Sequence, residues 1–97
     1  MHVIARKALV EFWTEHPDSE QALRAWYHEA SRAEWRPSAE VKQMYRSASI
    51  ISAERVVFNI CGNKYRLIVR IKYGRGVAFI RFVGAHAEYD AIDAETV

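Results

Sequence analysis

The C-terminal half of the chain contains three short β-type runs joined by tight turns, and this pattern constrains the fold more than any other. The runs are Arg55–Cys61, Tyr65–Lys72 and Val77–Val83, and apolar residues occupy alternate positions in each of them. Gly62-Asn63 and Tyr73–Gly76 lie between the runs, and glycine and asparagine accept the positive φ of tight turns. Because such short connections join neighbouring antiparallel strands, the pattern predicts a three-stranded meander.

Strict alternation assigns the residues of each run to one of two sheet faces. In the first run, Val56, Phe58 and Ile60 share a face. We expect one face of the sheet to pack against helices and the other to carry Arg66 and Arg70 toward solvent or a shallow groove. In the third run, the two sets are Ala78, Ile80 and Phe82 on one face, and Val77, Phe79, Arg81 and Val83 on the other.

The N-terminal half predicts two long helices. Apolar residues recur at helical spacing from Ile4 to Glu15, and again from Asp18 or Ser19 to about Trp35. The side chain of Asp18 can cap free amides where the second helix begins. Both helices carry an apolar stripe, which predicts that they are buried against the sheet.

A short third helix completes the expected set. Arg36-Pro37 breaks the second helix, and Ser38 can cap a helix that runs to about Tyr45. Residues 47–54 predict a connecting loop with room for a brief extended piece. Helices that precede the strands are typical of an α+β domain, so we expect the three helices to pack with a small, mainly antiparallel sheet.

Composition limits the classes of protein to which the chain can belong. Its 97 residues fit one domain, 1–97, and 51% hydrophobic residues argue against a disordered chain. The formal net charge is only +2, so any affinity for nucleic acid must come from local clustering of cations. The single cysteine, Cys61, excludes an internal disulfide and suits a reducing compartment. No apolar run approaches the roughly 20 residues of a membrane span, and we expect a cytoplasmic protein without membrane contacts.

A row of cations follows the second β-run. Arg66 and Arg70 are four residues apart, so their side chains leave the same face about 13 Å from each other. Lys72 extends this row and Lys64 stands at its entrance. Guanidinium groups suit phosphate because they present paired donors in one plane. The alternative is an ordinary solvated sheet face, and periodicity alone does not decide between the two.

A compact polar cluster follows the third run. His86, Tyr89 and Asp90 are spaced at i, i+3 and i+4, so they lie on one side of any helical turn formed there. Histidine can transfer protons near neutral pH, and tyrosine can stack on a nucleobase. Gly84 would let the chain turn sharply off the strand. The alternative is a C-terminal helix cap with a half-buried tyrosine.

Metal binding and cofactor binding are not predicted. His86, Glu88 and Asp90 alternate, but no second histidine-rich segment completes a ligand set and no HExxH pattern occurs. Gly74-Arg75-Gly76 is too short for a phosphate-cradling loop. We therefore expect no metal and no cofactor.

Four motifs stand out in the C-terminal half, and they are Arg55–Ile60, Gly62–Leu67, Ile80–Gly84 and His86–Asp90. These motifs resemble the HigB family of toxins, which are ribosome-dependent mRNA interferases of bacterial type II toxin–antitoxin modules with a RelE-like fold. The resemblance covers nearly the whole chain, and the C-terminal motifs occur in the family's order. The N-terminal likeness runs through Val3-Ile4, Arg6–Leu9, Phe12-Trp13, His16-Pro17 and Trp26.

The resemblance implies a RelE-like fold with an RNA-cleaving cleft on the sheet face away from the helices. It implies metal-free cleavage of mRNA in the ribosomal A site, in which the ribose 2′-hydroxyl attacks the adjacent phosphate. It also implies a partner antitoxin of the HigA type, whose helix-turn-helix domain binds DNA, so that the toxin meets DNA only indirectly.

The family's motifs assign roles to individual residues. The arginine of the Tyr-Arg-Leu motif falls on Arg66, which the resemblance places on the scissile phosphate. The histidine of the Val-Gly-x-His motif falls on His86, the candidate for proton transfer. Tyr89 is the candidate for orienting or stacking on the substrate base, with Lys64 and Arg81 as supporting cations. The division of acid and base among His86, Tyr89 and Lys64 stays open.

One position departs from the family pattern, because Ala85 stands where a threonine is expected before the histidine. We interpret the chain as a ribosome-dependent endoribonuclease toxin, with Arg70 and Lys72 as further RNA contacts. Two other functions remain possible on the residues alone. One is a non-catalytic RNA- or ribosome-binding module that uses the same basic face, and the other is an interaction protein that receives a partner segment.

Overall fold

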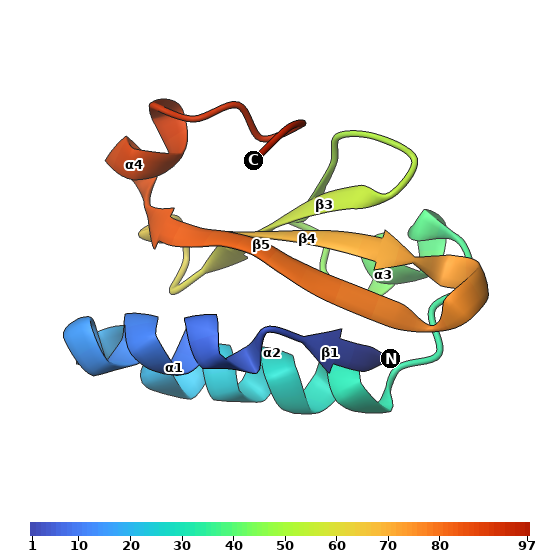
Figure 1. The fold of residues 1–97 in the computed structure, drawn as a ribbon, viewed down its shortest axis with the longest axis horizontal. Coiled ribbons are helices and arrows are strands. Elements are labelled where there is room, and N and C mark those ends of the chain that lie inside the picture. Colours follow the sequence, from blue (N-terminus) through green and yellow to red (C-terminus); the bar gives the residue numbers. More distant parts are fainter.

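The protein builds a five-stranded sheet with its two long helices on one side, as a computed structural model of residues 1–97 shows (Figure 1). The strand order across the sheet is β1-β5-β4-β3-β2. The strands are β1 (His2–Ile4), β2 (Ser49–Ile50), β3 (Arg55–Ile60), β4 (Tyr65–Lys72) and β5 (Val77–Ala85). The helices are α1 (Arg6–Glu15), α2 (Glu20–Arg32), α3 (Ser38–Met44) and α4 (His86–Asp90), with 3₁₀ turns at Pro17–Ser19 and Tyr73–Arg75.

The predicted α+β architecture and the antiparallel meander β3-β4-β5 are confirmed. The brief extended piece expected in residues 47–54 is β2, which pairs with β3. None of the helices is both long and apolar enough to cross a membrane.

The N-terminal strand β1 is a feature that the sequence did not predict. It pairs in parallel with β5, where His2 lies opposite Val77, so the sheet is mixed. The first helix therefore begins at Arg6 rather than at Ile4. Ala5 separates strand from helix with a φ of 74°, a left-handed conformation that is uncommon for a residue with a side chain.

The end of the second helix, the helix caps and the β3–β4 turn also differ from the prediction. The second helix ends at Arg32, short of Trp35, because Ala33 already adopts an extended conformation. Neither Asp18 nor Ser38 caps a helix with its side chain. In the β3–β4 turn the positive φ angles fall on Cys61 and Gly62, one residue earlier than the predicted pair.

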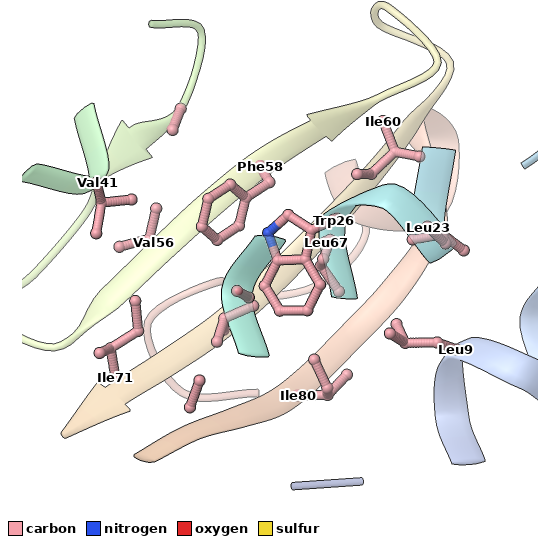
Figure 2. Packing of buried hydrophobic residues seen from close by; sticks show 14 of the residues in the cluster. Leu9, Leu23, Trp26, Val41, Val56, Phe58, Ile60, Leu67, Ile71 and Ile80 are labelled. Carbon is pink, nitrogen blue, oxygen red and sulfur yellow. The ribbon is translucent and has the colours of Figure 1, made fainter. Parts of the chain in front are cut away.

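The sheet face toward the helices, here called the helix face, carries the main core. Phe58 of β3 meets Trp26 of α2 edge to face, with ring centroids 5.4 Å apart (Figure 2). Leu9 of α1, Leu67 of β4 and Val41 of α3 are fully buried in the same cluster of 17 residues. Val56, Phe58 and Ile60 all belong to this cluster, as the alternation in the first run predicted. Full burial of such side chains contributes roughly 1.5–3 kcal/mol each.

The prediction of strict alternation in the third run is wrong, because β5 contains a bulge. Ile68 pairs with Phe82 and Val69 pairs with Ile80, so Arg81 has no partner in β4. One extra residue reverses the faces beyond it. Val83 accordingly packs against the helix-side core, although it was expected on the opposite face.

The opposite face of the sheet, here called the arginine face, carries Arg55, Arg66, Arg70 and Lys72 together with the bulge residue Arg81. Two apolar residues, Val57 and Ile68, are buried there although they lie outside the helix-side core. The segment 91–97 passes over this face, on the side of the sheet away from α1 and α2 (Figure 1).

Candidate active site

Arg66 and His86 meet where β4 begins and β5 ends. Arg66 pairs with Gly84 across the sheet, and β5 continues directly into α4, whose first residue is His86. Arg66 Nη2 lies 3.3 Å from His86 Nδ1. A second guanidinium nitrogen of Arg66 donates to the main-chain oxygen of Asn63 at 2.9 Å, which orients the planar group. The antiparallel register thus brings together two side chains that are 20 residues apart in sequence.

Tyr89 also lies beside the guanidinium of Arg66. The Arg66 Cζ is 5.9 Å from the centroid of the Tyr89 ring, within the range of a cation–π contact. Tyr89 is one helical turn beyond His86, so α4 places its phenol and the imidazole against one arginine. A half-buried aromatic ring beside a cation offers a stacking surface next to a phosphate-binding group.

The contacts of His86 select one tautomer of its ring. Arginine can only donate hydrogen bonds, so the neutral imidazole must accept at Nδ1 and carry its proton on Nε2. His86 Nε2 lies 3.3 Å from Oδ2 of Asp90, which can accept that proton's hydrogen bond. The sequence spacing had placed Asp90 on this side of the helix without giving it a role.

Main-chain contacts fix the start of α4. The carboxylate of Glu88 accepts the Ala85 N–H at 2.8 Å, and the His86 N–H donates to the main-chain oxygen of Lys64 at 3.3 Å. Ala85 occupies the N-cap position without a hydroxyl group, so the glutamate satisfies a free amide at this terminus.

Gly84 does not turn the chain off the strand, as was expected, because β5 runs on to Ala85. Its role is spatial. A Cβ at this position would lie 2.6 Å from Cζ of Phe82 and 3.3 Å from Oε1 of Glu88. Glycine therefore lets the Phe82 ring and the Glu88 carboxylate approach the strand.

The side chain of Lys64 pairs with an acidic residue of the helical layer and has no recorded contact with Arg66 or His86. Its ammonium group forms an ion pair with Asp18 of the 3₁₀ turn, and the same carboxylate accepts a hydrogen bond from the Tyr65 hydroxyl at 2.7 Å. These hydrogen bonds hold the pKa of Asp18 below its usual range and raise the pKa values of Lys64 and Tyr65. Asp18 thus ties the β3–β4 turn to the helical layer instead of capping α2.

Arg70 and Lys72 share one carboxylate. Glu54 lies 3.0 Å from the Arg70 Nε and 3.1 Å from the Lys72 Nζ. Hydrogen bonds from Lys72 and Arg70 lower the pKa of Glu54. Glu54 is therefore the counter-ion of the predicted row of cations at the end remote from His86. The composition of residues 47–54 did not predict this role.

Arg81 donates from Nε to the main-chain oxygen of Val97 at 3.3 Å. Of the seven side chains predicted to form the site, the structure brings together Arg66, His86 and Tyr89. The other four engage Asp18, Glu54 or the C-terminal segment. No group of three or more His, Cys, Asp or Glu side chains is arranged to hold a metal ion.

The site lies on an open surface. The largest cavity, of about 540 Å³, is elsewhere and is lined by residues that include Met1, Trp35 and Tyr73. An exposed arrangement of cation, imidazole and phenol can contact a polymer that lies across the surface. It can also exchange protons with a group bound beside the guanidinium.

Comparison with known proteins gives a consistent assignment. Residues 19–92 match the HigB_toxin family, described as the RelE-like toxic component of a toxin-antitoxin system. The chain is 26% identical over 96 residues to the mRNA interferase toxin HigB of Escherichia coli K12, and the match covers 97% of this chain and 92% of that protein. The mRNA interferases HigB of Escherichia coli O157:H7 and Shigella flexneri match to the same extent. Since the family match spans most of the chain, this protein belongs to the HigB family of toxins.

Proposed function

We propose that the protein is an endoribonuclease toxin that cleaves mRNA on the ribosome, with Arg66, His86 and Tyr89 as its catalytic residues. The observation that carries the proposal is the 3.3 Å approach of Arg66 Nη2 to His86 Nδ1 in a chain of this family. A cation and a proton-transfer group at this separation can act on one phosphodiester. The relatives' description as mRNA interferases supports the choice of substrate.

The proposed reaction is attack of a ribose 2′-hydroxyl on the adjacent phosphate. The new bond forms between the 2′-oxygen and phosphorus, and the bond from phosphorus to the 5′-oxygen breaks. A base takes the 2′-hydroxyl proton and an acid supplies a proton to the leaving 5′-oxygen. Cations stabilise the negative charge that develops on the phosphate oxygens.

The contacts of His86 suit it to be the base. In the free protein Arg66 donates to the Nδ1 lone pair. A phosphate that binds the guanidinium competes for that donor, which frees Nδ1 to accept the 2′-hydroxyl proton. Asp90, beside Nε2, then stabilises the imidazolium that forms. Arg66 stays on the phosphate, where its paired donors match the oxygen geometry.

Tyr89 has the position to orient the nucleotide. Its ring flanks the Arg66 guanidinium, so a base next to the scissile phosphate can stack on it. The phenol hydroxyl is also the candidate for donating a proton to the leaving oxygen. The predicted cations Lys64, Arg70, Lys72 and Arg81 remain proposed RNA contacts, and each must leave its present partner in order to bind.

The partners follow from the same proposal. mRNA presented in the ribosomal A site is the substrate, which places the activity in the cytoplasm. As the toxic component of a toxin–antitoxin system, the protein is expected to be neutralised by a cognate antitoxin. We propose that this antitoxin has a helix-turn-helix domain, through which the pair binds DNA.

The direct test uses the purified protein with translating ribosomes and a defined mRNA. Wild type should yield cut mRNA, and Arg66→Ala and His86→Ala should each lower the cleavage rate by about 10²–10⁴-fold. Arg75→Ala is the matched control, because Arg75 is exposed in the turn before β5 and should leave the rate unchanged. Melting curves must show that all variants are folded.

Two outcomes would contradict the proposal. Full activity of both site variants would defeat the assignment of the site. Binding of wild type to ribosomes without any cut product would favour the alternative, a non-catalytic RNA- or ribosome-binding module. A third reading, an interaction protein, predicts no growth arrest when the gene is expressed alone, whereas a toxin should arrest growth until its antitoxin is co-expressed.

A further inference from the structure

Two guanidinium groups from different strands converge on one main-chain oxygen of the arginine face. Arg55 Nη1 lies 2.6 Å from the Val97 oxygen, and Arg81 Nε lies 3.3 Å from the same atom. Arg55 Nη1 also donates to the Ala94 oxygen at 3.0 Å. Donors from two arginines around one oxygen form the arrangement that a phosphate oxygen needs.

The convergence depends on the bulge in β5. Arg55 is on β3 and Arg81 is on β5, so the two residues flank β4. Arg81 stands beside the step from Ile68 to Val69, where the bulge leaves it without a strand partner and exposed. A bulge re-aims the side chain that it carries. Here it accompanies an arginine that reaches over β4 toward Arg55.

This pair lies on the same face as the proposed catalytic residues. Arg55 pairs with Arg70, which is four residues along β4 from Arg66, and Arg81 lies between these two positions. At about 3.3 Å per residue, the pair is about 7–13 Å from Arg66 along the strand. Phosphates one or two nucleotide steps apart in one RNA strand can span that distance.

The segment that occupies the pair is acidic. Residues 91–97 contain Asp93 and Glu95, and Asp93 Oδ1 accepts the Glu95 N–H at 3.0 Å. A cavity of about 440 Å³ lies next to Arg55 and is lined also by Arg70 and Glu95. This acidic segment offers main-chain oxygens to arginines. In charge and in hydrogen-bond acceptors it is similar to the backbone of a nucleic acid.

We propose that Arg55 and Arg81 form a second phosphate-binding subsite for the RNA, which residues 94–97 fill until the RNA displaces them. The choice of RNA as ligand rests on the proposed function. The subsite binds a phosphate one or two nucleotide steps from the phosphate that is held at Arg66. The C-terminal segment therefore competes with the substrate for the same two guanidinium groups.

The first test measures equilibrium binding of a single-stranded 2′-O-methyl RNA oligonucleotide, which has no free 2′-hydroxyl and so cannot be cut. Arg55→Gln and Arg81→Gln should each weaken binding by about tenfold. Each should also reduce the slope of log affinity against log salt by about 0.7, the value for one lost contact with single-stranded phosphate. Arg75→Gln removes the same charge from an exposed turn and should change neither quantity. Unchanged affinity and slope in folded Arg55→Gln would overturn the subsite.

The second test addresses the competition. A chain that ends at Asp93 leaves both arginines free and should bind the oligonucleotide several times more tightly than the full chain. Equal or weaker binding by the folded truncated protein would overturn the displacement. Should the truncated chain fail to fold, carboxypeptidase digestion of the full chain decides the question. The oligonucleotide should speed release of the last residues, and unchanged or slower release would overturn the displacement.

These outcomes are separable from the proposed function. Wild-type cleavage of mRNA together with unaltered binding by Arg55→Gln would retain the toxin activity and remove the subsite. Weaker binding by Arg55→Gln together with no cleavage by wild type would retain the subsite and remove the nuclease.

Discussion

The two faces of the sheet use the same strands in different ways. On the helix face, large apolar side chains from β3, β4 and β5 join those of the helices in one continuous cluster. On the arginine face, Val57 and Ile68 are buried among cations whose partners are loop carboxylates and main-chain oxygens. Successive residues of β4 therefore belong alternately to a packed core and to a surface of cations that already have partners. We therefore expect substitutions on the helix face to lower stability, and substitutions of cations on the arginine face to lower activity with little change in stability.

The largest effect should come from comparing neighbours on β4. Leu67 and Ile68 are both fully buried, but only Leu67 belongs to the helix-side core. Leu67→Ala should lower the free energy of unfolding by about 3–5 kcal/mol, because the surrounding core cannot collapse around the cavity. Ile68→Ala should lower the free energy of unfolding by only about 2 kcal/mol, because the side chains over the arginine face can move into the space left by the isoleucine. Equal costs in urea denaturation would show that the two faces are packed alike.

A smaller effect is expected at Gly84, where the arginine face meets α4. Gly84→Ala should lower the free energy of unfolding by about 1–2 kcal/mol, because its methyl group would crowd Phe82 and Glu88. Gly74→Ala is the control. A Cβ there would meet nothing within 4 Å, and its expected change is within about 0.5 kcal/mol. Thermal melts of both variants measure the difference, and equal melting temperatures would refute the spatial role of Gly84.

A modest effect on activity is expected from Asp90 of α4, whose carboxylate contacts His86. Asp90→Asn should lower the mRNA cleavage rate by up to about fivefold, the scale of one exposed ion pair, with little change in the melting temperature. Glu34→Gln removes the same charge from an exposed residue between α2 and α3 and should leave the rate unchanged. ¹⁵N NMR of the ring nitrogens reports the tautomer of His86 directly. A proton on Nδ1 in the wild-type protein would contradict the proposed arrangement.

The smallest effect concerns Glu54, the exposed counter-ion of Arg70 and Lys72. Its pKa is lowered in the folded protein, so its ion pairs stabilise the fold above the pKa that the group has in the unfolded chain. This contribution is lost as the pH falls through the lower, folded pKa. The difference in unfolding free energy between wild type and Glu54→Gln should therefore be small at neutral pH and vanish in strong acid. A difference that grows on acidification would have the wrong sign.

Much of the fold could be predicted from periodicity. The runs that became β3 and β4 were correct to within a residue, because both alternate regularly and are bounded by turn residues. The strand β1 was missed because three residues carry no detectable period, and its partner β5 lies at the far end of the sequence. The bulge at Arg81 was missed because an inserted residue leaves the composition of a strand unchanged.

The candidate site was predicted in part. Motif positions pointed to Arg66, His86 and Tyr89, and the register of β4 with β5 brings these side chains together. Their catalytic roles stay predictions. Arg55 was not considered as a site residue, because its partners Ala94 and Val97 are distant in sequence. Only the folded chain shows which cations already have a partner.

The parallel pairing of β1 with β5 also has a consequence for synthesis. Strand β1 can join the sheet only after Val77–Ala85, which follows much later in the sequence, has been synthesised. Contacts of such wide sequence separation form slowly, because the intervening chain must be ordered first. The complete sheet, and with it the proposed ribonuclease activity, should therefore form only after β5 has left the ribosome.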